Sequence, residues 1–277
     1  MHIDAHQHFW QYSPQKYGWI DDAMASIRRD FLPADLQQLL EGNGFQGSVV
    51  VQVRQTLEET QWMLELADAN PFILGVVGWV DLCSPELGSQ LESFAGKTKL
   101  VGIRHIVQEE PDGFLLRPDF LRGISVLEEF DLAYDILIYP KHLPSAVEFV
   151  TRFPRQRFVL DHLAKPPIKS GALDAWARGI RELASFPNVY AKLSGLVTEA
   201  DWEAWTSDDI WPYLDVAFEC FGLGRLMIGS DWPVCLCAAS YKRAMNVVEQ
   251  YLDKCDGKAR EAVLGGNAAA FWRLRTR

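Results

Sequence analysis

Short apolar runs recur along the whole chain, and each is followed by a segment whose apolar residues have helical spacing. Residues 48–51 and 135–139 are almost continuously hydrophobic, which is typical of strands covered on both faces of a parallel sheet. On this pattern we predict eight strands, over residues 2–5, 47–53, 73–80, 100–106, 133–139, 157–162, 189–194 and 226–231.

The segments between these runs carry signals for the start and end of helices. Pro33 begins one helical pattern, and Thr56 with Glu59 has the spacing of a capping box. Further helices are expected to begin at Ser84-Pro85 and at Pro144, and apolar positions at helical spacing recur over residues 241–252.

Eight strands that alternate with helices, without an evident linker, predict a single domain over residues 1–277 with an α/β fold, a closed (β/α)8 TIM-like barrel. The length of 277 residues agrees with this architecture, which typically takes about 250 residues. The structural alternative is a doubly wound open sheet. No glycine-rich phosphate loop follows the first strand, which argues against a dinucleotide-binding sheet.

Charge and hydropathy exclude several classes of partner. The formal net charge is -10 and no dense basic stripe occurs, so a nucleic-acid partner is not expected. No window has about 18 consecutive apolar residues, so no membrane span is expected. The first strand begins too early for a secretory signal, and the five cysteines form no disulfide framework; both observations favour a cytoplasmic protein with reduced thiols. We expect a monomer or a homodimer.

His6 and His8 are the first candidates for chemistry, because they flank Gln7 at the end of the first predicted strand. Residues two apart in a strand point to the same side, so both imidazoles are expected to enter the barrel mouth. The carboxyl ends of the strands form the face where barrel active sites lie. Two neighbouring imidazoles are a natural half of a zinc site.

Asp231 and His162 end two further strands and complete this set. Asp231 is expected to ligate a metal, to accept a proton from water, or both; the alternative is a helix N-cap. His162 is expected to be the third imidazole, and the alternative is a core histidine. Asp161 is expected to point the other way and to have a structural role.

Other polar or aromatic residues at strand ends are candidates for substrate binding and carbonyl polarisation. His105 is assigned a catalytic role with Asp231 and His162. The candidates for substrate binding are Gln52, Arg54, Trp79, Arg104, Tyr139, His142, Lys192 and Trp232.

Taken together, these motifs resemble the amidohydrolase superfamily (amidohydrolase family 2) over nearly the whole chain. Within it the chain is most similar to the sugar-lactonase group, the L-fuconolactonases and L-rhamnonolactonases. The segments that carry the resemblance are residues 3–10, 18–24, 29–33, 51–56, 58–60, 102–105, 229–233 and 266–272.

The resemblance implies a metal centre with at most one divalent ion. Many members have a bridging lysine on the fourth strand and a histidine on the fifth, whereas here those strands end in Arg104-His105 and Tyr139. We therefore expect one ion, zinc before others, bound by His6, His8, His162 and Asp231. Action without a metal stays an alternative.

The function expected from this resemblance is hydrolysis of an L-sugar lactone, a small-molecule substrate, with Asp231 as the general base. Three alternatives are kept. They are hydrolysis of an acidic lactone related to a pyrone dicarboxylate, metal-dependent decarboxylation on the same fold, and a catalytically inactive barrel that binds a sugar acid.

Overall fold

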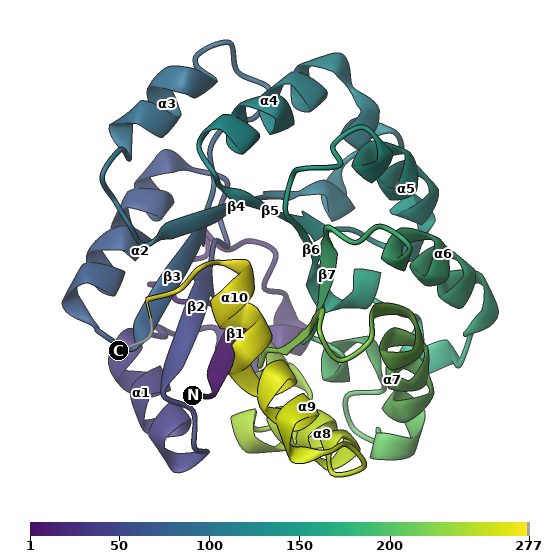
Figure 1. The fold of residues 1–277 in the computed structure, drawn as a ribbon. Helices are drawn as coiled ribbons and strands as arrows, with labels where there is room; N and C mark the ends of the chain where they lie inside the picture. Colours follow the sequence, from purple (N-terminus) through teal and green to yellow (C-terminus); the bar gives the residue numbers. More distant parts are fainter. Residues whose placement is uncertain (276–277) are drawn as a thin grey trace.

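The computed structural model describes residues 1–275, and eight parallel strands form its centre (Figure 1). Neighbouring strands pair in chain order from β1 to β8. The strands are β1 (Ile3–Gln7), β2 (Gly47–Val51), β3 (Ile73–Gly78), β4 (Leu100–Ile106), β5 (Ala133–Leu137), β6 (Phe158–Leu160), β7 (Val189–Leu193) and β8 (Leu226–Ile228).

Helices surround the strands and pack against their outer face (Figure 1). They are α1 (Pro33–Gly42), α2 (Leu57–Ala69), α3 (Leu87–Ser93), α4 (Pro118–Glu129), α5 (Leu143–Thr151), α6 (Asp174–Ala184), α7 (Ser207–Phe221), α8 (Tyr241–Leu252), α9 (Gly257–Glu261) and α10 (Asn267–Phe271). The predicted (β/α)8 barrel is therefore confirmed. Within residues 1–275 no helix combines the length and apolar character needed to cross a bilayer.

The apolar core has two parts. The larger part lies between the strands and the ring of helices, as a barrel with a helical layer requires. The smaller part fills the inside of the barrel with residues such as Ala5, Val51 and Met227, and Trp272 packs against it. Figure 1 shows α10 across the end of the barrel near the two termini. The interior is thus packed, and only the opposite end is open to a substrate.

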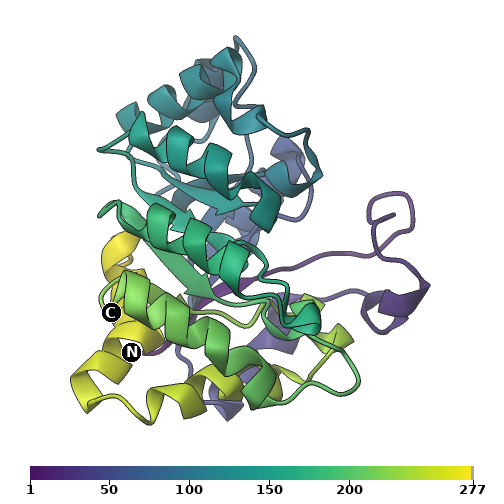
Figure 2. The ribbon, with the colours of Figure 1, turned by 90° about the vertical axis from the view of Figure 1, so that its right-hand side faces the viewer.

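Figure 2 shows the segment between β1 and α1 extending away from the barrel on the side opposite to the two termini. This segment contains a short 3-10 helix, Asp22–Ile27, and contacts the turn Val234–Cys237 after β8. It therefore stands at the rim of the open end.

Several predicted strands end earlier than expected. The predicted strands 157–162 and 226–231 stop at Leu160 and Ile228, and His162 and Asp231 beyond them have left-handed backbone conformations with φ of 52° and 56°. The capping box of α2 is half formed. Thr56 Oγ1 accepts from the Glu59 amide, whereas the Glu59 carboxylate accepts from the amides of the loop before the helix.

The contact between α4 and the loop after β3 gives a test of this packing. A Cβ on Gly123 would lie 2.1 Å from the carbonyl oxygen of Leu82, whereas a Cβ on Gly88 of α3 would meet nothing within 4 Å. Gly123→Ala is expected to lower the free energy of unfolding by about 1–3 kcal/mol through overpacking. Gly88→Ala, the matched control, should raise it by about 0.4–1 kcal/mol. Denaturant unfolding measures both, and a stabilised Gly123→Ala protein would contradict the packing.

Candidate active site

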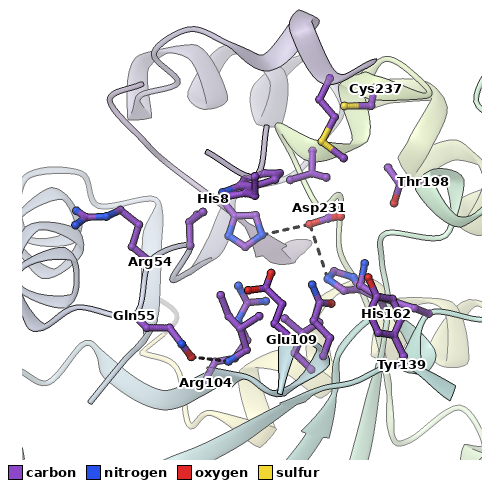
Figure 3. A pocket seen from close by; sticks show the side chains of 18 of the residues that line it. His8, Arg54, Gln55, Arg104, Glu109, Tyr139, His162, Thr198, Asp231 and Cys237 are labelled. Carbon is purple, nitrogen blue, oxygen red and sulfur yellow. Dashed lines mark hydrogen bonds and ion pairs between the residues drawn. The ribbon is translucent and has the colours of Figure 1, made fainter. Parts of the chain in front are cut away.

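A cavity of about 700 Å³ lies at the carboxyl ends of the strands (Figure 3). It is lined by residues of the loops after β1, β2, β5, β6, β7 and β8, and by the ends of β4 and β5. Among the residues expected from the sequence, the lining includes His8, Arg54, Arg104, Tyr139, His162 and Asp231.

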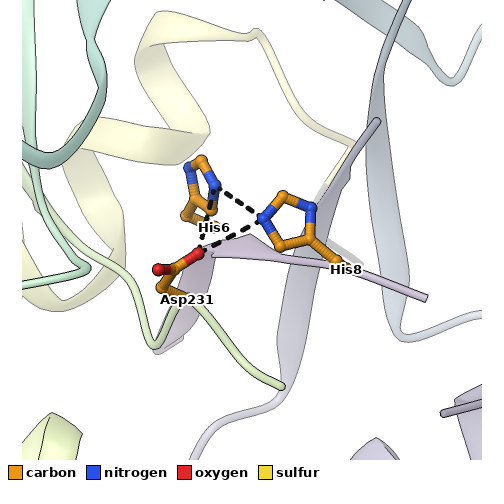
Figure 4. A group of neighbouring side chains, drawn as sticks. All are labelled: His6, His8 and Asp231. Carbon is orange, nitrogen blue, oxygen red and sulfur yellow. Dashed lines mark hydrogen bonds and ion pairs between the residues drawn. The ribbon is translucent and has the colours of Figure 1, made fainter. Parts of the chain in front are cut away.

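Three side chains converge at the floor of this cavity (Figure 4). His6 Nε2 lies 3.2 Å from His8 Nε2, and Asp231 Oδ1 lies 3.2 Å from His8 Nε2 and 3.7 Å from His6 Nε2. All three residues are buried. Their nitrogen and oxygen atoms form a nearly equilateral triangle.

An irregularity in β1 aims His6 into the barrel. Asp4 pairs with Ser48, but Gln7 pairs with Val50, so three steps along β1 oppose two steps along β2. A residue inserted in this way changes the side on which the following side chains lie. Asp4 accordingly contacts Tyr241 of the helical layer, whereas His6 contacts groups inside the barrel.

The triangle fits a divalent metal ion. Tetrahedral zinc, with bonds of about 2.0–2.2 Å, holds neighbouring ligand atoms about 3.3–3.6 Å apart, close to the observed separations. His8 Nδ1 donates to the carbonyl oxygen of Val51 at 2.7 Å, which leaves a lone pair on Nε2. His6 Nδ1 lies 3.4 Å from Asp161 Oδ1, an acceptor that favours the same tautomer. The lone pairs of His6 Nε2, His8 Nε2 and Asp231 Oδ1 then point toward one another, and a cation placed among them would be stabilised.

His162 stands beside the triangle and is placed by an unusual turn. Residues 162–165 all have positive φ, so the chain makes a left-handed turn directly after β6. His162 Nδ1 lies 2.9 Å from Ser194 Oγ, and its Nε2 lies 3.9 Å from Asp231 Oδ1. Gly195, with φ of 64°, makes room for the ring, because a Cβ there would lie 2.5 Å from His162 Nδ1. His162 is therefore near enough to act with the triangle.

Burial and charge set the protonation of these groups. Burial lowers the pKa of His162 to about 4 and that of His6 well below its ordinary value, so both are neutral near pH 7. Burial would raise the pKa of Asp231, but His162, His8 and His6 lower it below its ordinary value. The site thus presents neutral imidazoles around an ionised carboxylate.

A group of buried charges lies beneath the triangle. Lys192 Nζ contacts Asp135 and Asp161, and Arg104 Nη1 contacts Asp161 at 3.0 Å. Burial would raise the pKa of Asp161, but Lys192, His6 and Arg104 hold it well below its ordinary value. The expectation that Asp161 points away from His162 was wrong, because β6 ends before it and strand alternation no longer applies.

Several residues predicted for catalysis or substrate binding lie outside the cavity lining. His105 follows Arg104 and points to the other face of β4, where it pairs with Glu110 and stacks on Phe114. The catalytic role expected for His105 is therefore not supported. The other predicted residues that lie behind or beneath the lining are Gln52, Trp79, His142, Lys192 and Trp232.

The causes differ among these residues. Trp79 Nε1 donates to His105 Nδ1 at 3.4 Å, so both residues lie on the outer side of the strands. His142 is buried, and its Nδ1 accepts from the Tyr139 amide. Trp232 packs between Phe9 and Phe31.

The structure adds lining residues that the sequence did not single out. Glu199 pairs with Lys165 at 2.9 Å on one wall, and the Lys165 ammonium lies 5.9 Å from the centre of the Tyr139 ring. Trp202 and Glu109 also line the cavity. These residues lie in loops after the strands, where no periodic pattern marks them.

Comparison with known proteins agrees with this arrangement. A family model described as Amidohydrolase matches residues 3–274. The chain is 42% identical to L-fucono-1,5-lactonases of Burkholderia multivorans and Burkholderia ambifaria, covering 99% and 98% of this chain and 96% and 95% of those proteins. A crystal structure of an amidohydrolase from Burkholderia multivorans with bound zinc superposes with a TM-score of 0.96 at 41% identity, covering 99% of both chains. A match that runs from the first strand to the C-terminal helix shows that the chain belongs to the amidohydrolase family.

Proposed function

We propose that this protein opens an L-sugar lactone, such as L-fucono-1,5-lactone, to the sugar acid by attack of water on the lactone carbonyl. The observation that carries the proposal is Asp231, an ionised carboxylate on the cavity floor within reach of His8 and His162. The relatives named L-fucono-1,5-lactonase, 42% identical over nearly their full length, support the substrate class.

Lactone hydrolysis requires a deprotonated water and a stabilised carbonyl oxygen. Asp231 takes a proton as the water oxygen bonds to the carbonyl carbon. The ring carbon–oxygen bond then breaks, and Asp231 returns the proton to the ring oxygen as it leaves. Arg104, whose guanidinium is fixed by Asp161, lines the cavity close to His6 and offers positive charge to the developing oxyanion.

His6, His8 and Asp231, with His162 beside them, are the residues that would hold a divalent ion. Such an ion, when bound, supplies a Lewis acid for the carbonyl oxygen or the attacking water. His8 and His6 are oriented for this by Val51 and Asp161 respectively. His162 additionally orients water toward the carbonyl through its neutral imidazole.

The lining of the cavity suits a neutral polyhydroxylated substrate. Of the four Lys and Arg residues in the lining, Arg104 and Lys165 are each paired with a carboxylate, whereas Lys16 and Arg54 have no ion pair with a described residue. Glu109 and Glu199 add acceptors for sugar hydroxyl groups, and the aromatic side chains of Trp19, Tyr139 and Trp202 offer apolar surface for sugar C–H groups. An acidic pyrone lactone, the alternative substrate, would use Lys16 and Arg54 for its carboxylate groups, and the relatives named L-fucono-1,5-lactonase favour the sugar lactone instead. The five free cysteines are in keeping with action in a reducing compartment such as the cytoplasm.

A panel of freshly prepared L- and D-sugar lactones tests the proposed reaction. Acid release is followed in weak buffer against the spontaneous rate. We expect kcat/KM for L-fucono-1,5-lactone or a related L-sugar lactone to exceed that for its D counterpart by at least about tenfold, a difference that pocket contacts readily supply. Rates at background for every sugar lactone would refute the proposal, and activity on dihydroxybenzoates would favour decarboxylation.

The pKa of His162 gives a second test. Its folded value of about 4 lies below the ordinary 6.5, so the neutral form that the mechanism uses persists as the pH falls through 6.5. We expect kcat/KM to change less than about twofold between pH 8 and pH 5.5.

The same depressed pKa contributes stability that is fully present above pH 6.5 and is lost as the pH falls toward 4. Thermal unfolding at each pH is therefore measured in parallel to separate titration from unfolding. A tenfold loss of kcat/KM per pH unit below 6.5, in protein that is still folded, would contradict the assignment of a buried neutral imidazole.

A further inference from the structure

Lys192 is a charged residue enclosed inside the barrel. Its Nζ lies 2.5 Å from Asp135 Oδ2, 2.9 Å from Asp161 Oδ1 and 3.2 Å from His6 Nδ1. The side chains of Lys192, Asp135 and Asp161 have an exposed fraction of 0%. The face of Trp272 lies on a further side, with its ring centre 5.1 Å from Nζ. The ammonium is thus held by β1, β5, the end of β6 and the C-terminal segment.

The atoms around this ammonium are those that commonly bind a divalent metal. Carboxylate oxygens are ligands that zinc and similar ions commonly take. The Lys192 ammonium donates to Asp135 and Asp161, while His6 Nδ1, whose own hydrogen faces Asp161, lies 3.2 Å from Nζ without accepting from it. The space between these groups therefore suits a cation, and the ammonium group of Lys192 is the cation that occupies it.

This position adjoins the candidate metal centre through His6. The Nε2 edge of the His6 ring faces His8 and Asp231, and the Nδ1 edge faces Lys192. Ligand atoms of His6, Asp161 and His162 also lie within 4.8 Å of one another, which is the spacing of a second metal group. One imidazole thus separates two places where a cation can lie.

Both oxygens of Asp161 are already engaged by side-chain cations. Oδ1 contacts Lys192 at 2.9 Å, and Oδ2 contacts Arg104 at 3.0 Å. The Arg104 guanidinium also lies 3.4 Å from His6 Nε2. A second divalent ion bound by Asp161 would have to displace one of these cations and would be repelled by the other.

We propose that the ammonium of Lys192 occupies a second cation position behind His6 and thereby restricts this centre to a single divalent ion. Lys192 is on this account a positioning residue, which holds His6 and Asp161 without contacting the substrate. Truncation of Lys192 would leave two buried carboxyl groups around a space of the size of the lost side chain. That space would take a divalent cation or a small alkylammonium ion.

Metal content and thermal stability test the proposal without reference to activity. Wild type and Lys192→Ala are stripped with a chelator, equilibrated with Zn²⁺, and analysed for bound zinc per chain by mass spectrometry and calorimetry. Lys192→Ala is expected to bind one ion more than wild type. Propylammonium, which replaces the atoms removed by the substitution, is expected to raise the Tm of Lys192→Ala and to leave that of wild type unchanged.

Two further variants control for loss of charge. Lys192→Arg retains a cation at this position and should bind the same number of ions as wild type. Lys165→Ala removes a lysine paired with one carboxylate, Glu199, and should also bind no extra ion. An extra ion in Lys165→Ala would show that loss of any lysine suffices, and would overturn the proposal.

An equal zinc content in Lys192→Ala and wild type, together with no effect of propylammonium on Tm, would overturn it as well. If Lys192→Ala does not fold alone, recovery on refolding with Zn²⁺ or propylammonium is the expected result, and recovery with neither is the contradicting one. The readout is a difference between two proteins. It therefore does not depend on lactone hydrolysis, nor on whether wild type holds an ion at His6, His8 and Asp231.

Discussion

The first and last strands of the barrel are joined by two backbone hydrogen bonds, from Asp231 to His6 and from His8 to Trp232, and by the buried carboxyl group of Asp4. Within residues 1–275, β8 and β1 share a single isolated bridge, Gln7 with Trp232, instead of a continuous ladder. Asp4 Oδ1 accepts from the amides of Ser230 at 2.8 Å and His6 at 3.2 Å, and Oδ2 accepts from Ser230 Oγ at 2.6 Å. Because His6 and Asp231 flank this junction, closing the barrel also sets the geometry of the candidate site.

Buried charge is the second constraint on the site. Isolated ions are costly to bury, so each ion at the mouth must have a partner of opposite charge. Asp161 meets this condition with Lys192 and Arg104, and Lys165 meets it with Glu199. Asp231 is the carboxylate on the floor whose neighbours are imidazoles, of which His6 and His162 are neutral near pH 7, which is why a cation or a reacting water is expected there.

The sequence predicted the barrel and the identity of the central residues because both follow from local patterns. Continuous apolar runs indicate strands that are covered on both faces. The spacing of His6 and His8 indicates that both side chains point to the same side of one strand. It was harder to predict on which face of its strand each side chain lies. His105 directly follows Arg104 and so cannot share its face, whereas Asp161 enters the barrel because β6 ends early.

The pairing of distant charges could not be read from the chain. Lys192 meets Asp135 and Asp161 only because three strands bring them together, and Lys165 meets Glu199 across two loops. The left-handed turn at residues 162–165 contains no glycine, so the sequence does not indicate it. Such features depend on tertiary contacts that override local preference.

The turnover of Asp231→Asn on L-fucono-1,5-lactone tests the central claim most directly. Asparagine has the same shape and tolerates the left-handed backbone that residue 231 adopts, so the fold and Tm should be retained. It cannot accept a proton from water and is a weaker metal ligand, so kcat should fall at least about 100-fold. A folded Asp231→Asn protein with kcat within about threefold of wild type would contradict the account, because Asp161, the carboxylate on the other side of His6, is already paired with Lys192 and Arg104.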